Sequence, residues 1–302
     1  MNAVTVRDLT VRIPVGDRAV HAVTGVALTL EAGRMHALVG ESGCGKSTVG
    51  AALCGMLPRS ATVTGSVTLA DGVELVGARE RTLRRVRGAR VALVPQSAAT
   101  SFTPVRTVRS QLNELLRRHR CAHAVDDILA LVDLEPSVAA RYPHELSGGM
   151  AQRLAVGFAL ATEPDVIVAD EPTSHLDGTR ADHVLALLKS AADRGAAVLL
   201  VAHDLGRVRT YDDVTVMYAG RVVESGPAAD VFDDPWHDWT RDLLRALPSG
   251  GLVAIPGSPP ELTDGDDECP YHLRRPGTRF SGGPTHLVTV GTRTVRTRTD
   301  AS

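Results

Sequence analysis

The chain has 302 residues, and its 33 basic and 35 acidic side chains give a net charge of −2. This balance excludes a strongly basic nucleic-acid-binding protein, and a hydrophobic content of 43% excludes disorder throughout the chain. Four scattered cysteines argue against a disulfide framework and favour a reducing compartment. No stretch approaches the roughly 18 apolar residues of a membrane span, and we expect no signal peptide.

The N-terminal part of the chain predicts strands and a glycine-rich loop. Apolar residues alternate over 3–13 and 26–30, which predicts two strands. A short apolar run at 35–39 predicts a buried strand, and a helix is expected at about 47–57. The glycine-rich segment between them makes a strand–loop–helix unit, with which an α/β arrangement begins. A hairpin is expected at 62–76.

The rest of the chain alternates strands and helices before its composition changes. Leucine spacing predicts helices within 107–163 and at 179–194. Short apolar runs predict further strands at 91–94, 166–169 and 198–202, and a last hairpin is expected at 217–223, with its turn at Ala219 and Gly220. After about residue 245 the chain is rich in Pro, Gly and Asp, which predicts a linker into a weakly structured extension. The low-complexity segment 292–299 is expected to be frayed.

One segment matches the phosphate-loop pattern G-x-x-x-x-G-K-[ST] in full. It consists of Gly40, Glu41, Ser42, Gly43, Cys44, Gly45, Lys46, Ser47 and Thr48. Its glycines let successive backbone N–H groups point into one concavity that binds phosphate oxygens, and the following helix adds its positive end. We expect Lys46 to reach the β- and γ-phosphates of a nucleotide and the Ser47 hydroxyl to ligate Mg²⁺. Cys44 is interpreted as a small filler of the loop rather than a nucleophile.

A second signal is an apolar strand that ends in two carboxylates, Asp170 and Glu171. A buried strand of this kind delivers Asp170 to the carboxyl edge of a sheet, where ligands bind in α/β folds. There Asp170 can hold Mg²⁺, directly or through water, and Glu171 can orient and deprotonate an attacking water. Two adjacent acids could also be a solvated turn, but their pairing with a complete phosphate loop favours a nucleotide hydrolase or phosphotransferase.

Four further segments narrow this class. Ser147, Gly148 and Gly149 form a turn at a predicted helix start, a second anion-binding terminus. Gln96 ends a strand between the phosphate loop and this turn. The segment 174–177 follows the two carboxylates, and His203 follows the strand 198–202.

In order and spacing, these motifs resemble the nucleotide-binding subunit of ATP-binding cassette (ABC) transporters over about residues 3–240. The resemblance implies an α/β fold: a P-loop ATPase core of ABC type with an antiparallel β subdomain and an inserted helical subdomain near 97–160. Residues 1–245 would then form the nucleotide-binding domain. Residues 246–302 would form a C-terminal extension.

The resemblance also implies roles for the matching residues. Gln96 is similar to the glutamine-loop residue, and His203 is similar to the switch histidine. Together with Lys46 and Glu171 they would form the catalytic set. Ser47, Gln96 and Asp170 would hold Mg²⁺ on ATP. The signature turn Ser147–Gly149 of a second, identical or homologous, ATPase subunit would close over the γ-phosphate.

Several segments look like the oligopeptide/dipeptide/nickel importer branch of this family. They are residues 89–96, 101–105, 217–224, 235–240 and 255–262. This resemblance implies an ATPase that powers import of peptides, nickel or a related small solute. Its partners would be membrane permease subunits and, indirectly, an extracellular solute-binding protein, and it would work at the cytoplasmic face of the cell membrane.

Two alternatives stay open beside the importer. One is the ATPase of a peptide or drug exporter, against which the importer-type tail argues. The other is a soluble ABC protein that acts on DNA or ribosomes, which usually has two cassettes or a long coiled coil. This chain has one phosphate loop and no heptad run. The arginine-rich run 79–90 lacks interleaved aromatics, so we interpret it as a solvated helix face and expect no nucleic-acid partner.

The sequence departs from the family pattern at three points. No aromatic residue precedes Phe102, so the usual adenine-stacking side chain is missing, and Ile13 or His21 is the candidate to replace it. His175 stands where the family usually has Ala. The tail keeps only Cys269 of the usual cysteines, with Arg275 where another would fall, so we expect no metal cluster there.

Overall fold

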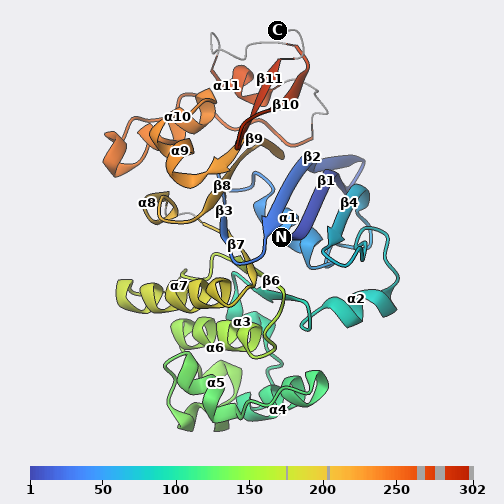
Figure 1. Cartoon of the computed structure of the whole chain (residues 1–302), viewed down its shortest axis with the longest axis vertical. Helices are drawn as coiled ribbons and strands as arrows, with labels where there is room; N and C mark the ends of the chain where they lie inside the picture. The colour runs from blue at the N-terminus through green and yellow to red at the C-terminus, as the bar shows by residue number, and fades with distance from the viewer. Residues whose placement is uncertain (175, 203–204, 264–268, 276–282, 299–302) are drawn as a thin grey trace. The chain divides into compact units, whose positions relative to one another are not determined.

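The computed structural model of the chain describes residues 1–174, 176–202, 205–263, 269–275 and 283–298 (Figure 1). By its packing the chain divides into two compact units. Unit 1 comprises Met1, residues 31–34 and residues 78–200, and unit 2 comprises residues 2–30, 35–77 and 201–302. The boundaries expected near residues 97, 160 and 245 stay predictions.

Unit 1 combines a few short buried strands with most of the helices of the described chain. Its strands are β5 (Val91–Val94), β6 (Val166–Asp170) and, but for its last residue, β7 (Ala197–Val201), in the order β7-β6-β5. β5 and β6 run parallel, which brings their carboxyl ends to one edge. Its helices are α2 (Glu80–Val86), α3 (Ala98–Ser101), α4 (Val108–His119), α5 (Val125–Leu131), α6 (Gly148–Leu160) and α7 (Gly178–Asp193). Two 3₁₀ turns, η1 (Pro136–Ala140) and η2 (Pro143–Glu145), lie between α5 and α6.

The helices expected within 107–163 are present as α4, α5 and α6. On α4 the buried residues Val108, Leu112 and Leu116 recur every four positions, so one stripe of the helix faces the core. The Thr107 hydroxyl caps this helix by accepting a hydrogen bond from the Ser110 N–H. The prolines that open η1 and η2 lack the N–H that a continuous helix needs, which explains why the region is broken into separate helices.

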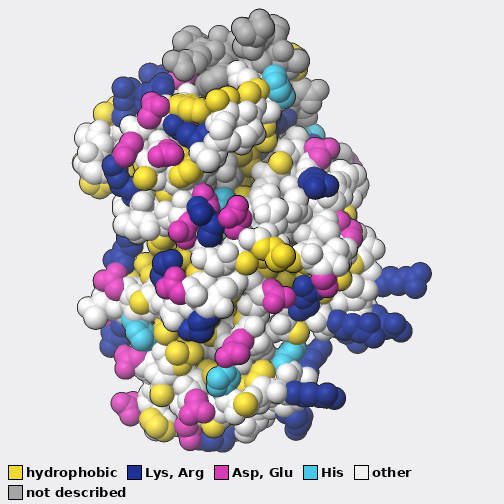
Figure 2. All heavy atoms as spheres, in the orientation of Figure 1, with side chains coloured by type: hydrophobic (Ala, Val, Ile, Leu, Met, Phe, Trp, Pro, Cys, Tyr) yellow, Lys and Arg dark blue, Asp and Glu magenta, His cyan; other side chains and the backbone are white. Residues whose placement is uncertain are grey.

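The middle of the arginine-rich run is a solvated helix face, as predicted, whereas Arg87 and Arg90 lie beyond α2 (Glu80–Val86) and are half-buried. Arg81, Arg84 and Arg85 are exposed on α2. The Arg84 guanidinium pairs with Glu80 one turn earlier at 3.2 Å. Figure 2 shows dark blue side chains that project into solvent along the edge where α2 lies in Figure 1.

Unit 2 contains two groups of strands and the phosphate-loop helix. The first group has the order β2-β1-β4, from β1 (Asn2–Val15), β2 (Arg18–Glu31) and β4 (Thr62–Leu69), with β1 and β4 antiparallel. The second has the order β10-β11-β9-β8-β3, from β3 (Met35–Gly40), β8 (Asp213–Tyr218), β9 (Arg221–Pro227), β10 (Thr285–Val290) and β11 (Arg293–Arg298). Its helices are α1 (Lys46–Leu53), α8 (Leu205–Val208), α9 (Ala228–Asp233), α10 (Asp238–Arg245) and α11 (Pro270–Arg274), and η3 (Pro248–Gly250) is a 3₁₀ turn.

The C-terminal part is more ordered than its composition predicts. Residues 293–298, expected to be frayed, form β11, which pairs with β10 and with β9. The buried Arg293 explains part of this order. Its guanidinium donates to the Glu224 carboxylate at 2.6 Å and lies 3.8 Å from the centroid of the Trp236 ring. A composition of Thr and Arg conceals such pairing because the partners come from elsewhere in the chain.

An aromatic cluster forms the core beneath this extension. Tyr218, Trp239 and Tyr271 pack with ring centroids 4.4–5.3 Å apart, and all three are buried. Cys269 is buried in the same cluster. Since Tyr271 and Cys269 lie in the extension and Trp239 on α10, this cluster holds the extension against β8.

Candidate functional site

The phosphate loop connects β3 to α1, as the sequence predicts. Gly40 and Gly45 have positive φ angles of 151° and 101°. A Cβ atom on Gly40 would lie 2.3 Å from the Met217 carbonyl oxygen, and one on Gly45 would lie 2.2 Å from that of Ala22. Only glycine fits at either position, so the loop backbone is fixed by its neighbours before any ligand binds.

Lys46 is the first residue of α1 and is 5% exposed. Its Nζ donates hydrogen bonds to the carbonyl oxygens of Gly40 at 2.9 Å and of Glu41 at 2.8 Å. The ammonium is thus held over the loop by neutral acceptors. Charged phosphate oxygens are stronger acceptors than these carbonyls, so the arrangement is ready to exchange them.

Cys44 fills the inside of the loop. Its thiol is buried, and the Sγ atom lies 2.8 Å from the position of a Cβ on Gly40. Burial raises the pKa of this thiol, against smaller lowering effects from Lys46. A buried thiol with a raised pKa is a poor nucleophile, in agreement with its interpretation as a filler.

The acidic end of β6 lies in unit 1. The strand is buried up to Ala169, and Asp170 is its last residue. Glu171 adopts the left-handed region with a φ of 48°, which costs a non-glycine residue about 1 kcal/mol. Ser174 holds it there, since its N–H and hydroxyl donate to the Glu171 carbonyl at 3.0 and 2.9 Å.

The structure brings two of the predicted catalytic residues together. The Gln96 amide Nε2 donates to the Glu171 carboxylate Oε2 at 2.9 Å, although 75 positions separate them in the chain. Because β5 and β6 are parallel neighbours, the segments that follow them meet at one edge. Because Nε2 donates to Glu171, the other polar atom of the Gln96 side chain is its amide oxygen, which can only accept hydrogen bonds.

The signature turn begins α6. The Ser147 hydroxyl accepts from the Met150 N–H at 3.2 Å, and Ser147 and Gly148 are exposed. The buried Gln152 on the same helix is not among the residues predicted from the sequence. Its Nε2 donates to the Pro95 carbonyl at 3.2 Å, so it ties the signature helix to the residue before Gln96. Its position within the signature segment was the available signal.

Two predicted positions, His175 and His203, lie outside the described residues. The two candidates for reading the adenine lie in unit 2, and both are half-buried. His21 precedes Ala22, whose carbonyl abuts Gly45, and its N–H donates to the Leu262 carbonyl of the extension at 2.6 Å. His21 is therefore on a segment that touches the phosphate loop.

The donor set can be tested against Mg²⁺. Ser47, Gln96 and Asp170 offer a hydroxyl, an amide oxygen and a carboxylate, the hard oxygen ligands that this ion prefers. Within the described ranges, no group of three or more His, Cys, Asp or Glu side chains is arranged to hold a metal ion. The expected absence of a metal cluster at Cys269 stays a prediction.

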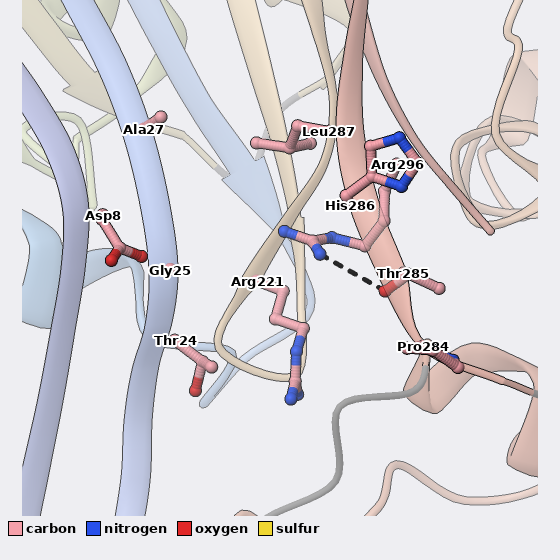
Figure 3. Close-up of a pocket in the computed structure, with 10 residues that line it drawn as sticks. All are labelled: Asp8, Thr24, Gly25, Ala27, Arg221, Pro284, Thr285, His286, Leu287 and Arg296. Atoms are coloured by element: carbon pink, nitrogen blue, oxygen red, sulfur yellow. Dashed lines mark hydrogen bonds between the residues drawn. The ribbon is translucent and has the colours of Figure 1, made fainter. Parts of the chain in front are cut away.

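A cavity of about 430 Å³ lies elsewhere in unit 2 (Figure 3). It is lined by Asp8, Thr24, Gly25, Ala27, Arg221, Pro284, Thr285, His286, Leu287 and Arg296. Arg296 extends its guanidinium toward the middle of the view and donates to the Thr285 hydroxyl at 3.3 Å. Burial and then the charge of Arg221 lower the pKa of Arg296 to about 10. None of the predicted site residues lines this cavity.

Two models of known protein families match the chain, one in its N-terminal part and one in its C-terminal part. The model of the family described as ABC transporter matches residues 23–174. The chain belongs to the ABC transporter family. A second model, the oligopeptide/dipeptide transporter C-terminal region, matches residues 223–279 of this ABC protein. The resemblance and the fold class inferred from the sequence are therefore confirmed.

Curated relatives extend over most of the ABC chain. It is 38% identical over 288 residues to the dipeptide transport ATP-binding protein DppD of Bacillus subtilis, covering 90% of this chain and 86% of that one. It is 39% identical to the probable D,D-dipeptide transport ATP-binding protein DdpD of Escherichia coli, covering 89% and 87%. To the oligopeptide transport ATP-binding protein OppD of Mycobacterium tuberculosis it is 40% identical, and it spans about half the length of that relative, 47%.

Among solved structures, the fold is similar to a dimeric ATP-binding cassette in a post-hydrolysis state bound to ADP and Pi. The TM-score is 0.68 at 25% identity, and the match covers 74% of this chain and 98% of the other. None of the helices in the described part of the chain combines the length and apolar content needed to cross a membrane.

Proposed function

We propose that the chain is the ATP-hydrolysing subunit of an ABC importer for peptides, nickel or a related small solute, bound at the cytoplasmic face of the membrane. One observation carries this proposal. A complete phosphate loop, with a buried lysine held over it, shares one chain with a C-terminal region of the oligopeptide/dipeptide type. The relatives named above, at 38–40% identity, support the same cargo class.

In this proposal the phosphate loop binds the ATP phosphates. The N–H groups of residues 41–48 and the N-terminal end of α1 provide the cradle. Lys46 transfers its hydrogen bonds from the Gly40 and Glu41 carbonyls to the β- and γ-phosphate oxygens. Little reorganisation is needed, because the ammonium is already desolvated and above the loop.

Ser47, Gln96 and Asp170 would hold Mg²⁺ through oxygen atoms. When bound, the ion neutralises part of the charge that develops on the β- and γ-phosphate oxygens.

Glu171 is the proposed general base. It takes a proton from the attacking water as the new oxygen–phosphorus bond forms and the bond between the γ-phosphorus and the β–γ bridging oxygen breaks. The hydrogen bond from Gln96 orients the carboxylate. His203 is assigned to the γ-phosphate on the family pattern alone.

A second ATPase subunit, identical or homologous, completes the site. Its Ser147, Gly148 and Gly149 would donate from the N-terminal end of α6 to the γ-phosphate of the first subunit. The exposure of Ser147 and Gly148 supports this assignment. ATP then holds the dimer closed and hydrolysis releases it, since the nucleotide binds the two states with different free energy. Permease subunits would couple this cycle to solute movement.

The direction of transport is tested in cells that lack the chain. An importer subunit predicts that its loss makes cells resistant to a toxic di- or oligopeptide supplied outside and reduces uptake of a labelled peptide. An exporter subunit predicts the opposite sign, greater sensitivity to the same compound. Complementation with the intact chain, but not with Glu171→Gln, must restore the wild-type response. Increased sensitivity in the deletion would contradict the proposal.

A further inference from the structure

Glu41 poses an electrostatic problem inside the phosphate loop. It is the one acidic residue between Gly40 and Thr48. A carboxylate at the edge of a triphosphate site repels the ligand. At the effective dielectric near a protein surface, two unit charges about 12 Å apart already cost roughly tenfold in affinity. A loop that binds ATP therefore gains affinity from a neutralising partner for this side chain.

The C-terminal extension supplies that partner. Arg274, the last residue of α11, donates from Nη1 to the Glu41 carboxylate Oε2 at 2.8 Å. The two residues are 233 positions apart. The Arg274 side chain is 6% exposed and that of Glu41 is 29% exposed. This ion pair is thus largely shielded from solvent on the arginine side, where salt screens it less than an exposed pair.

Other contacts fix Arg274 before it reaches the loop. Its Nε donates to the Pro256 carbonyl at 2.9 Å, and its guanidinium carbon lies 5.6 Å from the centroid of the Trp239 ring. The preceding part of α11 is anchored by Tyr271, which packs edge-on against Trp239 and Tyr218. The guanidinium is therefore presented to Glu41 in a set position.

Glu41 also links Arg274 to the predicted phosphate-binding lysine. Its side chain accepts from Arg274, and its main-chain carbonyl accepts from the Lys46 ammonium at 2.8 Å. A displacement of Glu41 would disturb both the charge at the loop and the support of Lys46.

We propose that Arg274 is a positioning residue for nucleotide binding: by neutralising and holding Glu41, it makes the C-terminal extension a requirement for full ATP affinity of the phosphate loop. The proposal rests on the proposed function, since it takes the loop as the ATP site. It assigns the extension a role in the ATPase itself, in addition to any role toward other subunits.

The test is a double-mutant cycle on the full-length chain, with the Kd for ATP measured by calorimetry in the presence of Mg²⁺. In the wild-type background Arg274→Ala should weaken ATP binding about tenfold. Adding Glu41→Gln to Arg274→Ala should restore the ATP affinity to within about twofold of wild type, because the double variant has the same net charge at this position as the wild-type pair. Arg275→Ala is the matched control. Arg275 pairs with Asp242 instead of Glu41, so its loss should leave ATP affinity unchanged.

Two readouts separate this role from a merely structural one. The loss in Arg274→Ala should shrink as salt is added and should be absent for adenosine, which carries no phosphate. Arg274→Lys, which keeps the charge, should recover part of the affinity. In steady-state assays the loss should raise KM and leave kcat within about twofold.

The outcomes are distinguishable. A wild-type chain that binds no ATP overturns the proposed function together with this proposal. A wild-type chain that binds ATP, with an Arg274→Ala variant of equal affinity, overturns the Arg274 proposal alone. A double variant that binds ATP as weakly as Arg274→Ala, or an equal loss for adenosine, also overturns it, because the effect would then come from packing.

Discussion

The phosphate loop and the acidic end of β6 are built by different means. The loop is a main-chain structure: two glycines admit close neighbours, and carbonyl oxygens hold Lys46. The acidic end is a side-chain structure, in which Gln96 orients Glu171. A main-chain cradle is suited to binding, because its N–H groups are present whatever the side chains are. A side-chain pair is suited to chemistry, because it can move a proton. Binding and hydrolysis should therefore be separable by mutation.

The strongest test of this comparison is Lys46→Ala. The substitution removes the one cationic side chain of the loop, and we expect it to abolish productive ATP binding and turnover. The measurements are the Kd for ATP and the steady-state rate of phosphate release. A melting curve controls for the fold, since Lys46 also bonds the loop carbonyls. Wild-type rates in a folded variant would contradict the role of the loop.

Glu171→Gln should separate the two functions. The amide keeps the shape of the side chain, and its oxygen can still accept from Gln96, but it cannot take a proton. We expect ATP binding to be retained while hydrolysis falls by ~10²–10⁴-fold. The ATP-bound dimer should then accumulate and be visible by size-exclusion chromatography. Normal hydrolysis in this variant would mean that another group is the base.

The contrast also explains what sequence could predict. The loop is contiguous, so its fold and its lysine follow from nine neighbouring residues, and the acidic strand end follows from the four apolar positions before it. The Gln96–Glu171 hydrogen bond depends on the parallel pairing of β5 with β6, which neither local motif predicts.

The partnership of Arg274 with Glu41 was not predictable in this way. It joins residues 233 positions apart, and neither lies in a repeating pattern that marks the other. The formation of β11 was not predicted for the same reason, since Arg293 on this strand contacts Glu224 and Trp236, which are distant in the sequence. The predicted site residues lie in local motifs, whereas the contacts that hold these motifs in place join residues that are distant in the sequence.

A buried histidine beside the C-terminal extension makes the folding stability sensitive to acid. His237 is fully buried, and its Nδ1 accepts from the Trp239 N–H at 3.0 Å, so Nε2 carries the proton toward the Cys269 sulfur. Burial lowers the pKa of His237 to about 3, with Asp238 raising it and Arg296 and Arg241 lowering it. The unfolded chain binds this proton below about pH 6.5 and the folded chain does not, so stability is full above that pH and falls as the pH drops toward 3.

The expected loss at pH 4.5, relative to pH 8, is roughly 2–3 kcal/mol in the free energy of unfolding. Urea titrations followed by fluorescence would measure it, because the chain has only two tryptophans, Trp236 and Trp239, and they flank His237. His237→Asn keeps an oxygen that can cap α10 but does not titrate. The difference between wild type and this variant isolates the histidine from the carboxylates, and equal losses in both would contradict the assignment.

The smallest expected effect concerns binding of the nucleotide base. No aromatic residue that could stack on the base precedes Phe102 in the sequence. If phosphates supply most of the affinity, the wild-type chain should discriminate poorly between ATP and GTP. A stacked aromatic is worth on the order of 1–3 kcal/mol, so Ile13→Tyr should tighten ATP binding by about 1 kcal/mol, the low end of that range, if residue 13 faces the base. Competition between ATP and GTP with Mg²⁺, in wild type, Ile13→Tyr and His21→Tyr, measures both statements. Of the two candidates, His21 has a described contact that places it near the phosphate loop, since it precedes Ala22, whose carbonyl oxygen lies against Gly45. The wild-type chain could instead prefer ATP strongly, with this preference unchanged in Ile13→Tyr and altered in His21→Tyr. That result would identify His21, through its imidazole ring, as the residue that recognises the base.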